Sequence, residues 1–181
     1  KTIKSNLIIM PDHMRNDTSI GIGTTLSTET HSLLSSGYGN VGIGRYALQS
    51  VTTGYRNNAI GNHSLTRLTT GFNNVAIGYN SLTSATTAIN NISIGTHSLH
   101  AATGSRNLAI GTESLQYLTS GEDNVCVGYQ AGRGAASTTT AYSNTAIGVK
   151  ALEKFTTCVG TVAVGMLAGA NITTGYSNIC I

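Results

Sequence analysis

The hydrophobic positions of this chain recur at about every seventeenth position, in a unit well represented by Asn73 to Leu82. Each unit has an Asn, an apolar residue, a small residue, Ile or Val, and Gly, followed three or four positions later by a small residue and Leu. The Gly of successive units are Gly44, Gly61, Gly78, Gly95, Gly111, Gly128, Gly148 and Gly165, and their sequence numbers differ by 17, 17, 17, 16, 17, 20 and 17. A ninth unit begins at Asn178 and reaches Ile181. So short and regular a period predicts a repeat architecture.

Two apolar columns alternate with one column of small residues before each Gly. The position next to the Gly is always β-branched, and the position two residues earlier is mostly apolar, so strand alternation points both to the same side. The first column is Ile43, Ile60, Ile77, Ile94, Ile110, Val127, Ile147, Val164 and Ile181, and the second is Val41, Asn58, Val75, Ile92, Leu108, Val125, Thr145, Val162 and Ile179. This pattern predicts one short β-strand in each unit.

The residues between those two columns point the other way, and none is larger than Cys. They are Gly42, Ala59, Ala76, Ser93, Ala109, Cys126, Ala146, Ala163 and Cys180. A solvated face would tolerate Lys, Glu or Thr at these positions. We therefore expect tight packing against this small-residue column, either by another wall of the coil or by another chain.

The rest of each unit reads as a return path. The Gly closes the strand where a turn needs positive φ or a close backbone approach. Leu and a second apolar position follow, as at Leu65 and Leu68, and a Thr-rich corner leads to the next Asn, a residue suited to turns. Gly replaces the Leu at Gly132 and Gly169, where we expect a locally thinner core.

The predicted fold class is therefore all-β, a parallel β-solenoid or β-roll of about 17-residue coils stacked about 4.8 Å apart. Residues 1–39 form an irregular lead-in with a degenerate first coil, whose strand we place at Ile20–Gly23. Residues 40–181 form the regular array, a fragment that stops in mid-repeat. A three-residue expansion within 129–143 predicts a bulging loop.

Composition adds an expectation about assembly. Only 9% of residues are charged, the net charge is +3 without a basic cluster, and no run of 18 apolar residues occurs. These features argue against nucleic-acid binding and a membrane-spanning helix. Each coil offers few large apolar side chains, so we expect several chains to associate through the small-residue column.

Four copies of the unit carry a family resemblance: NVGIG (40–44), NNAIG (57–61), NNVAIGYNSL (73–82) and NTAIGVKAL (144–152). Over about residues 20–181 the chain resembles the N-x-A-I-G arrays of phage and viral tail fibres, which often precede an intramolecular chaperone domain. It is also similar to the head repeats of trimeric autotransporter adhesins, which form a left-handed β-roll. The resemblance implies an elongated homotrimeric fibre or adhesin segment, and a left-handed coil.

Catalytic and cofactor sites are not predicted, and we expect no enzyme activity. Gly37, Gly39 and Gly42 match a dinucleotide-binding spacing, but the helix and acidic residue that this motif requires are missing. Among seven carboxylates, Glu122 and Asp123 are the sole adjacent pair, and adjacent side chains diverge. No Ser, base and orienting group form a recognisable set.

Metal binding is not predicted either. His63 and His97 share a column but lie two coils apart, about 10 Å by strand spacing, which is too far for one ion. A ring of histidines across a trimer is left open. We expect a solvated edge here, because the same column holds Tyr46, Asn80, Glu113, Gln130 and Lys150.

The cysteines bear on the compartment. Cys126 and Cys180 lie three coils apart, about 14 Å, beyond disulfide reach, and Cys158 falls in a corner. Three reduced thiols favour assembly in a reducing cytoplasm, as for virion proteins, over export through an oxidising periplasm.

The predicted function is a structural segment of a viral or phage tail fibre that supports host attachment, at the virion surface or extracellular. The alternative is the head of a bacterial trimeric adhesin. An ice-binding solenoid ranks third, on a threonine ladder of Thr52, Thr69, Thr86, Thr139, Thr156 and Thr173. A host glycan or protein receptor would contact exposed positions such as Arg67, Tyr79, Tyr117 and residues 133–140.

Overall fold

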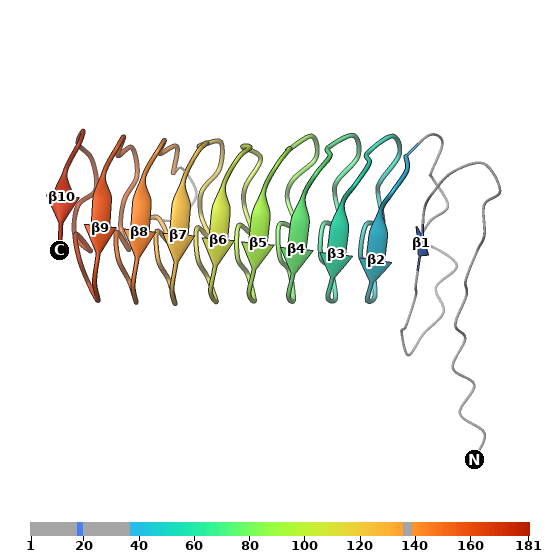
Figure 1. Ribbon diagram of the computed structural model, residues 1–181, viewed down its shortest axis with the longest axis horizontal. Helices are drawn as coiled ribbons and strands as arrows, with labels where there is room; N and C mark the ends of the chain where they lie inside the picture. The colour runs from blue at the N-terminus through green and yellow to red at the C-terminus, as the bar shows by residue number, and fades with distance from the viewer. Residues whose placement is uncertain (1–17, 20–36, 136–138) are drawn as a thin grey trace, which may run out of the picture.

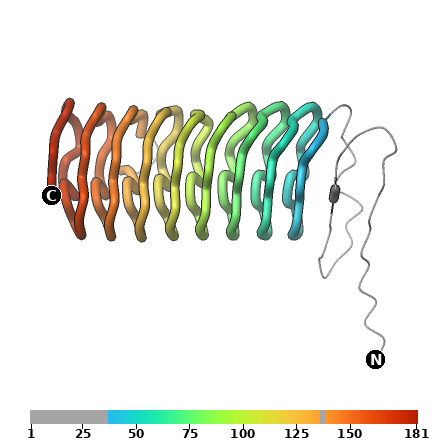
Figure 2. Tube along the Cα trace, viewed as in Figure 1, coloured from blue at the N-terminus to red at the C-terminus, as the bar shows by residue number. Residues whose placement is uncertain are grey.

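The computed structural model describes residues 18–19, 37–135 and 139–181. They form a parallel β-solenoid in which each coil contributes one short strand to a single ten-stranded sheet (Figure 1). Each coil leaves the sheet, turns back beside it and returns one step further along the axis (Figure 2). The described residues form no helix, and the predicted all-β parallel solenoid is confirmed.

The sheet runs in sequence order from one end of the molecule to the other. Its strands are β1 (Thr18–Ser19), β2 (Val41–Ile43), β3 (Asn58–Ile60), β4 (Val75–Ile77), β5 (Ile92–Ile94), β6 (Leu108–Ile110), β7 (Val125–Val127), β8 (Thr145–Ile147), β9 (Val162–Val164) and β10 (Ile179–Cys180). All pairings are parallel and keep the repeat in register, so that Ala76 of β4 stands beside Ser93 of β5. Identical columns of the sequence therefore stack directly on one another.

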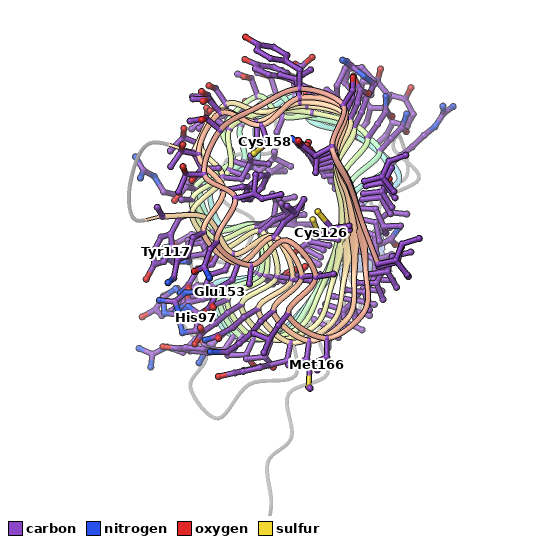
Figure 3. All side chains as sticks on the ribbon, turned by 90° about the vertical axis from the view of Figure 1, so that its left-hand side faces the viewer. His97, Tyr117, Cys126, Glu153, Cys158 and Met166 are labelled. Carbon is purple, nitrogen blue, oxygen red and sulfur yellow. The ribbon has the colours of Figure 1, made fainter. Side chains whose placement is uncertain are left out.

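The small-residue column lies inside the coil. Its side chains in β3, β4 and β6 to β9 are fully shielded within one chain, and they belong to the same core as the leucines. Figure 3, viewed along the axis, shows Cys126 of this column pointing into the interior. Our prediction that chains associate through this column is therefore wrong, because its members in β2 to β9 are buried and leave no surface for a second chain.

A narrow interior explains the small side chains. The leucine column and the second apolar column, as at Leu65 and Leu68, are fully buried and fill the space opposite the strands. Close packing leaves room only for Ala, Ser or Cys on the strand wall. Where Gly132 replaces a leucine, a Cβ built there would lie 2.4 Å from the Cys126 sulfur. The predicted thinning is thus offset by the larger Cys.

A buried asparagine ladder runs beside the strands. Asn40, Asn57, Asn74, Asn91, Asn107, Asn124 and Asn144 are all buried. Each Oδ1 accepts from the backbone N–H of the next residue in the ladder, as between Asn57 and Asn74 at 3.1 Å, and Thr161 continues the series at 2.9 Å from Asn144. The column thus joins coils rather than closing a local turn, and the positive φ falls one residue earlier, for example at Asn73 (58°).

Serine hydroxyls join four of the coils to the next strand. The Oγ of Ser64 donates to the carbonyl of Ala76 at 2.9 Å, and Ser114 reaches the carbonyl of Cys126 at 3.1 Å. A buried hydroxyl needs a hydrogen-bond partner, and the carbonyl of the next strand supplies one. Ser can therefore occupy the small position that precedes the leucine.

Two predicted features fall partly outside the described residues. The first strand is β1, which pairs with β2 in the register of the later coils, whereas Ile20–Gly23 lies outside the described residues. Within the expansion in 129–143, residues 136–138 also lie outside them, and Thr139 resumes the array through a parallel bridge to Leu118.

Candidate functional site

The outer side of the sheet is an apolar surface, which we call the strand face. It consists of the two outward columns of β2 to β10 and Ile181, and only Asn58 and Thr145 among these residues are polar. Ile77 and Ile110 are each 36% exposed, Ile147 is 42% exposed, and none of these positions is charged. Figure 3 shows this dense row of carbon side chains projecting from the sheet into solvent.

The next column along the chain widens the strand face in four coils only, because it holds Arg45, Asn62, Thr96 and Thr112 in the others. Tyr79, Tyr129, Val149 and Met166 follow the strand-closing glycines directly and are exposed. Strand spacing and residue rise give β2 to β10 a face of about 40 Å by 10 Å, or about 400 Å² before this column is added. That is about half of what each partner buries in a standard interface.

A second surface lies away from the strand face, and we call it the polar edge. It consists of two neighbouring columns in four successive coils, which hold His97 and His100, Glu113 and Gln116, Gln130 and Arg133, and Lys150 and Glu153. Figure 3 shows His97, Glu153 and the adjacent Tyr117 together on the side of the coil opposite the sheet.

Charged side chains of the polar edge form one network. Gln130 Nε2 donates to Glu113 Oε2 at 2.7 Å, and Arg133 Nε lies 3.7 Å from the same oxygen, an ion-pair distance too long for a hydrogen bond. Arg133 Nη1 lies 3.8 Å and Lys150 Nζ 3.2 Å from Glu153 Oε1. Two acids and two bases therefore alternate over three coils without net charge.

Our expectation of a solvated edge in this column is wrong at Gln130, which is only 7% exposed. The polar edge is not visible when each column of the sequence is weighed alone. Aligning Glu113, Gln130 and Lys150 with the residues three positions later would have found it.

The histidines do not converge on a metal site. His63 packs on Tyr46 at 4.7 Å between ring centroids, whereas His97 meets Tyr79 and His100 edge-on. Among the described residues, no group of three His, Cys, Asp or Glu side chains is placed to hold an ion.

Glu122 and Asp123 form an ion-pair site with Arg106 from the preceding coil. Arg106 Nε lies 2.7 Å from Asp123 Oδ1, and Arg106 Nη2 reaches Glu122 Oε2 at 2.5 Å. The hydrogen bond from Arg106 lowers the pKa of the Asp123 carboxyl, despite the opposing desolvation.

Removing this pairing is expected to raise the Asp123 pKa with little effect on stability, because exposed ion pairs contribute little. Since the folded pKa is lowered, the contribution exists above the unfolded pKa of about 3.9 and disappears as pH falls through the folded pKa. NMR titration of Arg106→Met against the parent chain measures the shift, and an unchanged Asp123 pKa would contradict the pairing.

The cysteines and threonines act within the chain. All three cysteines are free, and burial raises the pKa of the Cys126 and Cys158 thiols, which keeps them protonated. The hydroxyl of Thr69 donates to the carbonyl of Thr86 at 3.0 Å. Thr52 and Thr156 donate in the same way to the carbonyl of the next threonine in the ladder. Hydroxyls bonded to the next coil are not presented to ice, so the structure adds no support to an ice-binding function.

An aromatic stack on the corner before the strands was not predicted. The rings of Tyr38, Tyr55 and Phe72 lie 5.0 Å and 4.6 Å apart and nearly parallel, with the Arg56 guanidinium 5.8 Å from both tyrosine rings. An aromatic at every seventeenth position in this part of the sequence was the available signal.

The positions predicted to contact a receptor do not share one surface. Arg67 and Tyr79 are exposed, and Tyr79 borders the strand face. Tyr117 is half-buried and borders the polar edge, next to Arg133. Within 133–140, residues 136–138 lie outside the described residues.

No family model, curated protein or solved structure matches this chain. The described part of the chain has no helix with the length and apolarity needed to cross a bilayer. Function must therefore be inferred from the geometry of the two surfaces.

Proposed function

We propose that this chain is a structural segment of a viral or phage tail fibre, in which three copies assemble through the strand face and support attachment to a host surface. The observation that carries the proposal is an uncharged face that extends from β2 to β10 and is apolar except at Asn58 and Thr145. At about 400 Å² the face is comparable with the largest apolar patch of a typical monomer, and patches of that size often mark interaction sites.

The occupant that fits this face is another copy of the chain. The strands repeat in register about every 4.8 Å, so a partner can keep equivalent contacts over the whole face only if it has the same rise. A second copy has that rise and the same apolar side chains. Packing against a second copy also buries additional apolar surface of each coil, a role that we first assigned to the small-residue column.

The three free cysteines support a fibre assembled in a reducing compartment over an adhesin exported through an oxidising one. The adhesin head remains the alternative, because it would use the same strand face. Location at the virion surface follows from the proposed function.

Native mass spectrometry and sedimentation at micromolar concentration test the assembly. The parent chain is expected at three times the 18.7 kDa mass of one copy. The double variant Ile77→Lys, Ile110→Lys is expected to dissociate, with association weakened about 100-fold or more, because each lysine would bury an unpaired charge.

The matched control is Thr70→Lys, Thr87→Lys, which adds the same charge at two exposed corner positions. It should remain trimeric. A parent chain that is monomeric and folded at these concentrations, or a strand-face variant that stays trimeric, would overturn the proposal.

A further inference from the structure

The strand face repeats itself in every coil, so its apolar contacts alone do not fix how two copies align along the axis. The outward column that opens each strand is Val, Ile or Leu in β2, β4 to β7, β9 and β10. A copy shifted by one coil, about 4.8 Å, would therefore meet similar side chains and lose only the contacts at its ends. Repetitive faces of this kind specify their register weakly.

Asn58 and Thr145 interrupt this column. In the sheet Asn58 stands between Val41 of β2 and Val75 of β4, and Thr145 has a valine on each side in the same way. Both residues lie on the strand face and are half-buried in a single chain. They are the positions at which this face differs from a copy of itself shifted by one coil.

The strands themselves do not require these polar side chains. The backbone N–H of Asn58 donates to the carbonyl of Asn74 at 2.8 Å, and the equivalent N–H of Val75 donates to the carbonyl of Asn91 at 2.8 Å. The coil is thus built in the same way with Asn or Val at this position. Asn is also depleted from strands in general, whereas Val is enriched. A role between chains explains this Asn better than a role within one coil.

An aligned trimer gives each of the two residues partners of its own kind. When three chains run parallel and in register, the copies of one coil lie at one height, so three Asn58 side chains share one layer. An amide both donates and accepts, so this layer can form its own hydrogen bonds, as can a layer of three Thr145 hydroxyls. A shift by one coil would place each Asn58 amide among valines, and burying a polar group without a partner costs free energy.

The separation of the two residues makes the aligned arrangement unique. Asn58 lies in β3 and Thr145 in β8, so the two meet only if one copy is displaced until β8 stands beside β3. That displacement would leave β7 to β10 of one copy against β2 to β5 of the next and expose the remainder of both faces. Every smaller shift places polar residues against apolar ones.

We propose that Asn58 and Thr145 set the axial register of chains that associate through the strand face. The inference rests on the proposed function, because it requires this face to be an interface between copies. In coiled coils a polar residue at one position of an otherwise apolar seam fixes register in the same way, at a cost in stability.

The test moves one polar layer by one coil. The double variant Asn58→Val, Val75→Asn keeps the composition of the column and relocates its amide to β4. By itself this variant should form a trimer, because its three amides again share a layer. Refolded together with a parent chain that carries a mass tag, it should form mixed trimers at least tenfold below their random share, as measured by native mass spectrometry.

A second variant and a control complete the experiment. Thr145→Val, Val162→Thr relocates the other layer and keeps the test decisive if the first variant fails to fold, which circular dichroism reports. The matched control is Arg67→Ser, Ser84→Arg, which exchanges two side chains between neighbouring coils in the column of Tyr117, on the side opposite the sheet (Figure 3). The control should mix with the parent chain at random.

Two results would overturn the inference. One is random mixing of the parent chain with a relocated variant that folds, and the other is a relocated variant that is folded but monomeric. Neither contradicts the proposed fibre, because the parent chain is trimeric in both. A parent chain that is itself folded and monomeric contradicts the fibre, and the register inference with it.

Discussion

Replacing Gly78 by Ala is expected to destabilise the solenoid by more than about 3 kcal/mol. Gly78 closes β4 with φ of 136°, and a Cβ built there would lie 2.5 Å from the carbonyl oxygen of Gly95 in the next coil. The clash is with backbone, so no side chain can move to relieve it, and the two coils must separate. Thermal unfolding at fixed protein concentration measures the loss, since assembly makes the transition concentration-dependent.

The control is Gly165→Ala, which has nearly the same backbone conformation without the clash. Its φ is 127°, but the nearest atom to a built Cβ is 3.9 Å away on Ala168. This variant isolates the conformational strain and is expected to lose about 1–3 kcal/mol. Hydrogen exchange should increase most in the coils of Gly78 and Gly95. Equal losses in the two variants would show that coil contact does not explain the glycine column.

Replacing Asn74 by Asp is expected to destabilise the chain by about 3 kcal/mol or more at neutral pH. The buried Nδ2 donates to Asn57 Oδ1 at 2.9 Å and to the carbonyl of Ala88 at 2.8 Å. A carboxylate would place an unpaired negative charge against these two acceptors. Chemical denaturation across a pH series measures the penalty.

The loss of stability in Asn74→Asp should depend on pH in a defined direction. Burial would raise the carboxyl pKa above the unfolded value of about 3.9, so the folded state would bind the proton more tightly. The penalty should therefore be smallest below about pH 4 and increase as pH rises through the folded pKa. Asn73→Asp is the control. Asn73 is the adjacent residue and its side chain is exposed, so this substitution should change stability little. A pH-independent penalty would contradict the ladder.

The two surfaces lie on different sides of one coil and differ in chemistry. The strand face is apolar, uncharged and continuous over every described coil from β2 onward, as expected of a surface for association. The polar edge is confined to four coils and carries mixed charge, fixed amides and aromatic rings.

The repeat period and its alternation determined the fold from sequence alone. A Gly at about every seventeenth position, preceded by a β-branched residue, specifies a short strand and a turn, and copies of one unit can stack only in parallel register. The confirmed register between Ala76 and Ser93 follows from this directly. These features are local or repetitive, so no knowledge of distant contacts was needed.

Which side of the strand faces inward was decided by the tertiary structure. Hydrophobicity favours placing Ile77 inside and Ala76 outside, but Leu65 and Leu68 already fill the narrow coil, so the volume available selects the smaller side chain. The backbone conformation at the leucines was also decided by tertiary contacts. Leu65 is buried at φ of 49°, an uncommon choice for Leu that its propensity would not predict.

The hydrogen bonds between coils hold Leu65 in that conformation, for example through the carbonyl of Ser81 at 3.1 Å. The polar edge arises in the same way, because equivalent residues of successive repeats come together only when coils stack. Sequence pattern thus determined the coil and its repetition, whereas packing within a coil too narrow for two large walls decided which surfaces reach solvent.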